Sequence, residues 1–253
     1  MKLEGNIALV TGGGSGLGAA TAETLAAAGV KVAVLDINKE AAEAVAEKIG
    51  GIAIVCDVAS PEAAEAAIAQ AREAHGAARI LINCAGIGVA KRILGKEGPQ
   101  ALSDFERVIR INLLGSFNML RLAAADMSKL EPLEDGERGV IVNTASAAAF
   151  DGQLGQAAYS ASKGGIVAMA LPAARELAQF GIRMMTIAPG LFLTPLLANL
   201  PEEIQKSLAA SIPFPKRLGA AQEFADLAAH CVTNMSLNGE VIRLDGALRL
   251  PPR

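Results

Sequence analysis

Aromatic residues are scarce in this sequence of 253 residues, which has no tryptophan and a single tyrosine, Tyr159. Proteins that bind single-stranded nucleic acids stack the bases on aromatic side chains, so this scarcity argues against such a partner. Charge of either sign is also not in excess: 23 Lys and Arg face 26 Asp and Glu, giving a net charge of −3. Neither nucleic acid nor an anionic membrane is therefore expected as a partner.

Cysteine and histidine are equally rare, with three of the first and two of the second. Cys56, Cys84 and Cys231 are far apart and form no C-x-x-C pair, which predicts free, buried thiols in a reducing compartment. With the two histidines also distant from each other, no metal site is expected. Glycines or prolines interrupt both uncharged runs, and no secretory or transit pattern is visible. The sequence thus predicts a cytoplasmic protein.

Hydrophobic residues make up 52% of the chain, and they recur in short apolar runs separated by Ala-rich stretches. Continuous apolar runs are typical of strands buried on both faces of a parallel sheet. The predicted strands are 7–11, 31–36, 52–57, 80–83, 140–146, 183–188 and 240–244. The predicted helices between them are 16–28, 39–49, 61–75, 103–127, 156–180 and 222–233.

This regular alternation predicts an α/β fold, a single doubly wound Rossmann domain over residues 1–253. Its seven-stranded parallel sheet would carry helices on both faces. Two polar segments, 91–102 and 129–138, are predicted to be loops. The proline-interrupted apolar stretch 191–217 is predicted to form a lid over the site.

A glycine-rich turn follows the first predicted strand and precedes the first helix. Small residues there let the backbone approach a pyrophosphate, and the helix amino terminus offers free N–H groups and a positive dipole. The turn contains Gly12, Ser15, Gly16, Leu17 and Gly18. The alternative is a turn with only a structural role, but the strand–turn–helix context favours dinucleotide binding.

The second predicted strand ends in Asp36, about 20 residues beyond the glycines. A carboxylate there can accept hydrogen bonds from both hydroxyls of an adenosine ribose, and it repels a 2′-phosphate. This favours NAD over NADP as cofactor. Asp36 could instead cap the following helix, or do both.

Tyr159 and Lys163 are four residues apart in a predicted helix, so their side chains share one face. A phenol must lose about three pKa units, or about 4 kcal/mol, to act as a base near neutral pH. An ammonium about 4 Å away supplies roughly that amount. Ser146, at the end of the preceding strand, could hold a substrate oxygen while Tyr159 moves the proton. An ordinary surface pair is the alternative, disfavoured by the dinucleotide turn upstream.

Together, and in this order, these motifs resemble the short-chain dehydrogenase/reductase family over essentially the whole chain. The resemblance implies a catalytic set of Asn112, Ser146, Tyr159 and Lys163, with Asn112 supporting a proton relay. It also implies that Tyr159 and Lys163 contact the cofactor, together with Asp57, Val58, Asn83, Ala85, Gly86, Pro189, Gly190 and Thr194. Cys84 departs from the family's usual asparagine.

Segments 157–167, 185–192 and 238–247 are similar to the subgroup that acts on 3-hydroxyacyl-CoA thioesters. This resemblance implies reversible NAD-dependent oxidation of a 3-hydroxyacyl-CoA to the 3-ketoacyl-CoA, by a homotetramer. Another NAD-dependent hydroxysteroid or secondary-alcohol dehydrogenase is one alternative. A non-catalytic dinucleotide-binding scaffold is the other, because fold alone does not fix function.

On the substrate side the sequence says less. Expected substrate contacts are Ser146, Gln153, Tyr159, Leu191 and Phe192, although Gln153 could simply fill its loop and the lid residues could serve a helix core. A small basic cluster could meet the phosphates of coenzyme A or be an ordinary solvated loop; it consists of Lys91, Arg92 and Lys96.

Overall fold

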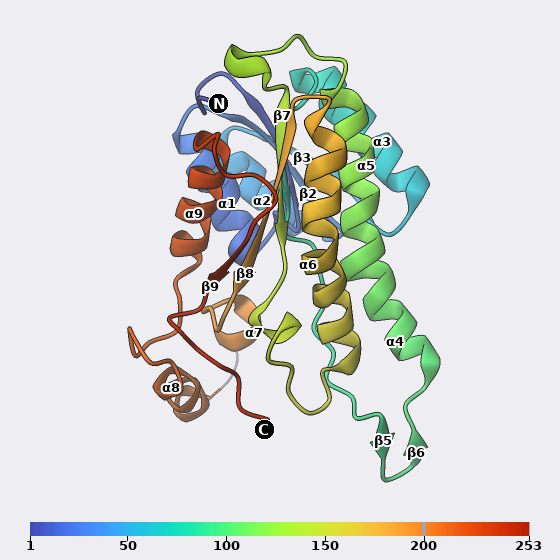
Figure 1. Ribbon diagram of the computed structural model, residues 1–253, viewed down its shortest axis with the longest axis vertical. Helices are drawn as coiled ribbons and strands as arrows, with labels where there is room; N and C mark the ends of the chain where they lie inside the picture. Colours follow the sequence, from blue (N-terminus) through green and yellow to red (C-terminus); the bar gives the residue numbers. More distant parts are fainter. Residues whose placement is uncertain (199–200, 253) are drawn as a thin grey trace.

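The computed structural model describes residues 1–198 and 201–252. Within this part of the chain, seven parallel strands form one sheet in the order β3-β2-β1-β4-β7-β8-β9 (Figure 1). The strands are β1 (Ile7–Thr11), β2 (Lys31–Asp36), β3 (Ile52–Val55), β4 (Ile80–Asn83), β7 (Gly139–Thr144), β8 (Ile182–Pro189) and β9 (Val241–Leu244). The prediction of a seven-stranded parallel sheet is confirmed.

Helices cover both faces of the sheet, as a doubly wound fold requires (Figure 1). One face packs against α1 (Gly16–Ala27), α2 (Lys39–Ile49) and α9 (Ala221–Thr233). The other packs against α3 (Pro61–His75), α5 (Gly115–Met127) and α6 (Ala157–Ala178). Small alanines on these helices let them lie close to the Val- and Ile-rich strands, so two apolar cores sandwich the sheet.

Residues 103–127, predicted as one helix, form three consecutive pieces. These are α4 (Leu102–Ile109), a π-helical turn (Arg110–Leu114) and α5. A π turn inserts one residue into the helical repeat, which leaves the overall apolar pattern readable as a single helix. The inserted turn carries Asn112, whose side chain it directs into the interior.

The connections at the carboxyl ends of the strands, the lower end in Figure 1, hold the irregular structure. The predicted loop 91–102 contains a small hairpin of β5 (Leu94–Gly95) and β6 (Gly98–Pro99). The predicted lid contains α7 (Pro195–Ala198) and α8 (Glu202–Ala210), and its base is closed by backbone hydrogen bonds between Gly219 and residues Leu191 and Leu193. Asn199 and Leu200 of the lid lie outside the described residues.

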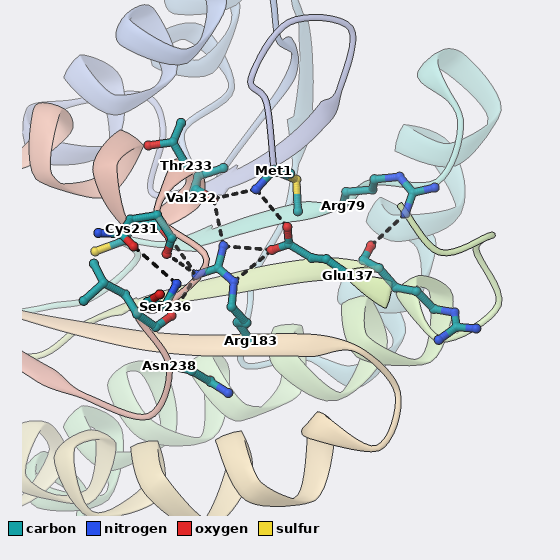
Figure 2. A network of polar contacts seen from close by, with 12 residues as sticks. Met1, Arg79, Glu137, Arg183, Cys231, Val232, Thr233, Ser236 and Asn238 are labelled. Carbon is teal, nitrogen blue, oxygen red and sulfur yellow. Dashed lines mark hydrogen bonds and ion pairs between the residues drawn. The ribbon is translucent and has the colours of Figure 1, made fainter. Parts of the chain in front are cut away.

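The opposite, amino-terminal ends of the strands are joined by a buried polar network around Arg183 (Figure 2). The guanidinium lies 2.8 Å from Glu137 Oε1, and Glu137 Oε2 lies 2.8 Å from the nitrogen of Met1. The Arg183 guanidinium also donates to four main-chain carbonyls at and after the end of α9, those of Cys231, Val232, Asn234 and Leu237. Arg183 therefore satisfies acceptors that the end of a helix leaves open.

All three cysteines are free, as predicted. Cys56 and Cys231 are buried, whereas Cys84 is only half-buried and borders the cavity described below. No helix among the described residues has both the length and the apolar character needed to cross a membrane.

Candidate active site

A cavity of about 540 Å³ opens at the carboxyl ends of the strands. It is bordered by the turn between β1 and α1, the segment after β4, the end of β7, one face of α6 and the start of the lid. The predicted site residues that line it are Gly12, Ser15, Gly16, Leu17, Gly18, Gly86, Ser146, Gln153, Tyr159, Lys163, Pro189, Gly190, Leu191, Phe192 and Thr194. Residues distant in the sequence thus converge at one place.

The glycine turn is packed too closely to admit side chains. A Cβ on Gly18 would lie 2.1 Å from the carbonyl oxygen of Gly12, and one on Gly12 would lie 2.7 Å from the nitrogen of Ala85. Gly12 also adopts φ +61°, a left-handed conformation that favours glycine. The turn leads directly into the amino terminus of α1 at the cavity wall, which fits the binding of a pyrophosphate.

Asp36 is held against this turn rather than against the following helix. Its Oδ2 accepts a hydrogen bond of 3.0 Å from the nitrogen of Gly14, and its Oδ1 accepts one of 3.0 Å from the nitrogen of Asn38. The cap of α2 is Asn38, whose side chain accepts from the nitrogen of Ala41. The carboxylate therefore lies beside the glycine turn, which is where a contact with the adenosine ribose of NAD requires it.

Ser146, Tyr159 and Lys163 meet in the cavity, with Ser146 just after β7 and the other two on one face of α6. Lys163 is 5% exposed; its Nζ donates a 2.7 Å hydrogen bond to the carbonyl of Thr144 and lies 5.9 Å from the centre of the Tyr159 ring. That carbonyl fixes the ammonium next to the phenol. The arrangement suits proton transfer at an oxygen held between Ser146 and Tyr159.

The electrostatics of Tyr159 differ from the expectation drawn from spacing. Burial raises the pKa of the Tyr159 phenol, and a hydrogen bond with Ser146 lowers it only in part. The spacing between Tyr159 and Lys163 predicts a lower pKa for the phenol, but spacing carries no information on the cost of burying a phenolate. The cofactor-free protein consequently holds Tyr159 as a neutral phenol at neutral pH.

Asn112 lies one layer behind the cavity, next to Lys163. Its Oδ1 accepts from the nitrogen of Ile87 at 2.8 Å, and its Nδ2 donates to the carbonyl of Ile87 at 2.9 Å and to Ser162 Oγ at 3.1 Å. A Cβ built on Gly86 would stand 3.1 Å from Asn112 Oδ1 and 3.7 Å from Lys163 Nζ. Asn112 therefore ties the π turn, the segment after β4 and α6 together around the lysine.

Several predicted cofactor residues support the cavity from outside its lining. Thr11 Oγ1 and Asn83 Oδ1 are 3.3 Å apart, and the nitrogen of Ala85 donates to Thr11 Oγ1. Asp57 Oδ1 accepts from the nitrogen of Ala59, beyond the end of β3. The predicted residues that do not border the cavity are Asp36, Asp57, Val58, Asn83, Ala85 and Asn112.

Two further residues at the cavity are not indicated by any sequence motif. Thr144 contributes through its carbonyl group. Leu250 comes from the segment after β9. The lid residue Leu197, which the sequence allows either in a substrate groove or in a helix core, borders the cavity. Gln153 lines the cavity as predicted, but its side-chain nitrogen donates to the carbonyl of Pro251 in the segment after β9.

Burial of Lys163 predicts a pH dependence of stability. Burial lowers the pKa of this ammonium from 10.5 to about 8. Between those values the unfolded chain binds more protons than the folded one, so stability rises with pH across this window. In the cofactor-free protein the gain approaches about 3 kcal/mol.

Urea unfolding of wild type and Lys163→Met between pH 7 and 10.5 measures this effect. The unfolding free energy of wild type relative to the variant should increase through the window. If the unfolding free energies of the two proteins changed with pH in parallel, burial would not lower the pKa of Lys163 in the folded protein.

Comparisons with known proteins agree with this geometry. A family model of short chain dehydrogenases matches residues 6–205. The 3-hydroxyacyl-CoA dehydrogenase type-2 of Homo sapiens is 52% identical over 255 aligned residues, covering 99% of this chain and 98% of that protein. The crystal structure of 3-hydroxyacyl-CoA dehydrogenase type-2 from Mycobacterium avium superposes with a TM-score of 0.94 at 44% identity, covering 98% of each chain.

A second solved structure is also similar. The 3-ketoacyl-(acyl-carrier-protein) reductase from Brucella melitensis, complexed with NADH, gives a TM-score of 0.86 at 30% identity and covers 98% of this chain and 100% of that one. Motifs, fold and similarity along the whole length therefore agree, and the chain belongs to the short chain dehydrogenase family.

Proposed function

We propose that this protein is an NAD-dependent oxidoreductase that reversibly oxidises a 3-hydroxyacyl-CoA to the 3-ketoacyl-CoA. The observation that carries the proposal is the meeting of Ser146, Tyr159 and Lys163 in one cavity with the glycine turn. The substrate class is supported by relatives of 52% and 44% identity that are named 3-hydroxyacyl-CoA dehydrogenase type-2. The cofactor is supported by the NADH-complexed neighbour and by the position of Asp36.

Three side chains divide the chemistry. Ser146 donates a hydrogen bond to the substrate oxygen, and Tyr159 takes the hydroxyl proton as the carbon that bears the hydroxyl loses a hydride to the cofactor. Lys163 holds a positive charge beside the phenol and would hydrogen-bond the cofactor ribose. Bound NAD would supply the hydride acceptor, and its positive charge would offset the burial that raises the pKa of Tyr159. Asn112 keeps Lys163 and its helix in place.

The cofactor would be held along the sequence motifs already described. The pyrophosphate would lie against the turn of Gly12, Ser15, Gly16, Leu17 and Gly18, and the adenosine ribose against Asp36. Asp57 and Val58 would contact the adenine. The ribose and nicotinamide end would be held by Asn83, Ala85, Gly86, Tyr159, Lys163, Pro189, Gly190 and Thr194.

Replacement of Asp36 should shift cofactor preference. Hydrogen bonds to a charged group contribute about 1.5–3 kcal/mol, so Asp36→Asn should weaken NADH binding by about 10- to 100-fold. The ratio of the affinity for NADH to the affinity for NADPH should decrease, because the carboxylate that repels the 2′-phosphate is gone. Titration of both cofactors by their fluorescence checks this. Glu40→Gln, an exposed acid in the first turn of α2, is the control, and unchanged discrimination would contradict the assignment.

The substrate would enter beside Gln153, Leu191 and Phe192, which line the cavity. The hairpin that follows β4 presents Arg92 and Lys96 as exposed cations, whereas Lys91 is already paired with Asp104 at 2.6 Å. We assign the coenzyme A phosphates to Arg92 and Lys96. Raised KM for acetoacetyl-CoA in the Arg92→Gln/Lys96→Gln double variant, with kcat maintained, is the expected result.

Initial rates with acetoacetyl-CoA and NADH test the function itself. Brisk oxidation of NADH supports the proposal, and the reverse reaction with 3-hydroxybutyryl-CoA and NAD must also proceed. No turnover of either thioester, alongside rapid turnover of a steroid or a simple secondary alcohol, would overturn the substrate assignment. Tight NADH binding without turnover of any alcohol or ketone would favour a dinucleotide-binding scaffold.

We also propose that residues 1–253 act as one domain with a lid at 191–217, and that four copies assemble. Two exposed apolar side chains support self-association: Leu114, at the end of the π turn, is 54% exposed, and Phe117, in α5, is 49% exposed. Helix α6 offers a second candidate face. A sedimentation mass four times the 25.9 kDa of one chain is expected.

Three free thiols support a reducing, cytoplasmic location.

A further inference from the structure

The segment that follows β9 is held firmly by Arg243. The guanidinium donates to the carbonyl of Leu248 at 2.9 Å, to Asp151 Oδ2 at 2.5 Å and to Asp245 Oδ2 at 2.7 Å, and it stacks over the ring of Phe150. Leu248 is fully buried. These contacts fix the course of residues 245–252, which descend to the same end of the molecule as the lid and the hairpin (Figure 1).

The end of this segment, at Pro251 and Pro252, is hydrogen-bonded to the loop between β7 and α6. Gln153 Nε2 donates to the carbonyl of Pro251 at 3.1 Å, and the nitrogen of Leu154 donates to the carbonyl of Pro252 at 3.0 Å. The other side of that loop is held by a 2.8 Å hydrogen bond from the nitrogen of Lys91 to the carbonyl of Gly155. Three segments remote in sequence thus form one connected rim of the cavity.

Leu250 lies between these anchors and is half-buried at the cavity. The side chains that border the same cavity from the lid include Leu191 and Leu197, so lid and tail together offer aliphatic surface. Of the two exposed cations, Lys96 lies in the turn of the hairpin and Arg92 lies just before its first strand. The aliphatic side of the cavity suits the alkyl chain of an acyl-CoA substrate, and the basic hairpin region suits the coenzyme A part of that substrate.

We propose that Leu250 is a specificity-determining residue, a fixed wall that limits the length of the alkyl chain accepted beside Tyr159. Gln153 is then a positioning residue that holds this wall through Pro251, rather than a ligand of the reacting oxygen. The proposal rests on the proposed function for the nature of the substrate. It assigns a role to residues 249–252 that the short chain dehydrogenase motifs do not carry.

The test compares kcat/KM for 3-ketoacyl-CoA substrates of four, eight and ten carbons. One methylene in an apolar pocket changes specificity by about 10- to 200-fold, so Leu250→Ala should raise the ten-carbon to four-carbon ratio at least about tenfold. Leu250→Phe should lower the ratio. Gln153→Leu should shift it in the same direction as Leu250→Ala, through KM for the long substrates.

Leu193→Ala is the matched control, because Leu193 is an exposed leucine of the lid that does not border the cavity. Chain-length ratios within twofold of wild type in both Leu250 variants would overturn the proposal. If wild type reduces no 3-ketoacyl-CoA, the proposed function fails separately. The wall is then tested with methyl ketones of rising length, where an unchanged ratio in Leu250→Ala would overturn it.

Discussion

Tyr159→Phe should lower kcat at least about 10³-fold while NADH binding stays within about threefold of wild type. The phenol oxygen is the group that takes the substrate proton, and general acid–base catalysis contributes about 10²–10⁴-fold. The ring itself is retained, so the packing of α6 around Lys163 should be unaffected. NADH fluorescence titration and initial rates with acetoacetyl-CoA measure the two quantities independently.

Ser146→Ala serves as the companion variant, with an expected loss smaller than that of Tyr159→Phe because the hydroxyl orients rather than transfers the proton. Activity of Tyr159→Phe within tenfold of wild type would contradict the assignment of the base. A parallel loss of NADH binding would instead assign the phenol hydroxyl mainly to cofactor binding.

The second large effect is on stability and lies at the opposite end of the sheet. Arg183→Met removes one of the two cationic partners of the buried Glu137 carboxylate and the donor to four carbonyls near the end of α9. Removing one member of a buried ion pair costs about 3–5 kcal/mol. This is a large share of the roughly 5–15 kcal/mol by which most proteins are stable.

Urea unfolding followed by circular dichroism measures this loss. Arg79→Met is the matched control, since the guanidinium of Arg79 donates to two carbonyls at the same end of the sheet and joins no ion pair among the described residues. Its loss should be about 1–2 kcal/mol. The folded fraction of Arg183→Met should keep a normal kcat, because the network does not touch the cavity. A loss below 1 kcal/mol for Arg183→Met would show that the network contributes little.

The parts of this fold that are readable from sequence are those with a local cause. Strands β1 and β2 have the predicted bounds, because buried parallel strands are uninterrupted apolar runs that end at glycine or aspartate. Helix α3 begins at Pro61 as expected, where Ser60 caps it by accepting from the nitrogen of Ala63. The π turn at Asn112 is not readable, since one inserted residue barely disturbs the apolar repeat.

The parts of the site that escaped prediction depend on tertiary structure. The pKa of Tyr159 is set by how deeply the ring is buried, which spacing to Lys163 does not reveal. The carbonyl of Thr144 that holds Lys163 has no side-chain signature. Leu250 reaches the cavity only because Arg243 and Gln153 hold its segment there, and no local pattern connects residues separated by about a hundred positions.

The placement of the single tyrosine in the reaction centre gives the protein an unusual optical property. With no tryptophan and no second tyrosine, only Tyr159 can contribute a tyrosinate absorbance. A rise in absorbance at the tyrosinate wavelength therefore reports ionisation of that phenol alone. In the cofactor-free protein the midpoint of the rise should lie above the ordinary phenol pKa of about 10, because burial raises the pKa of Tyr159. A shift to lower pH when NAD binds would give the electrostatic effect of the cofactor on its catalytic base directly, without any added label.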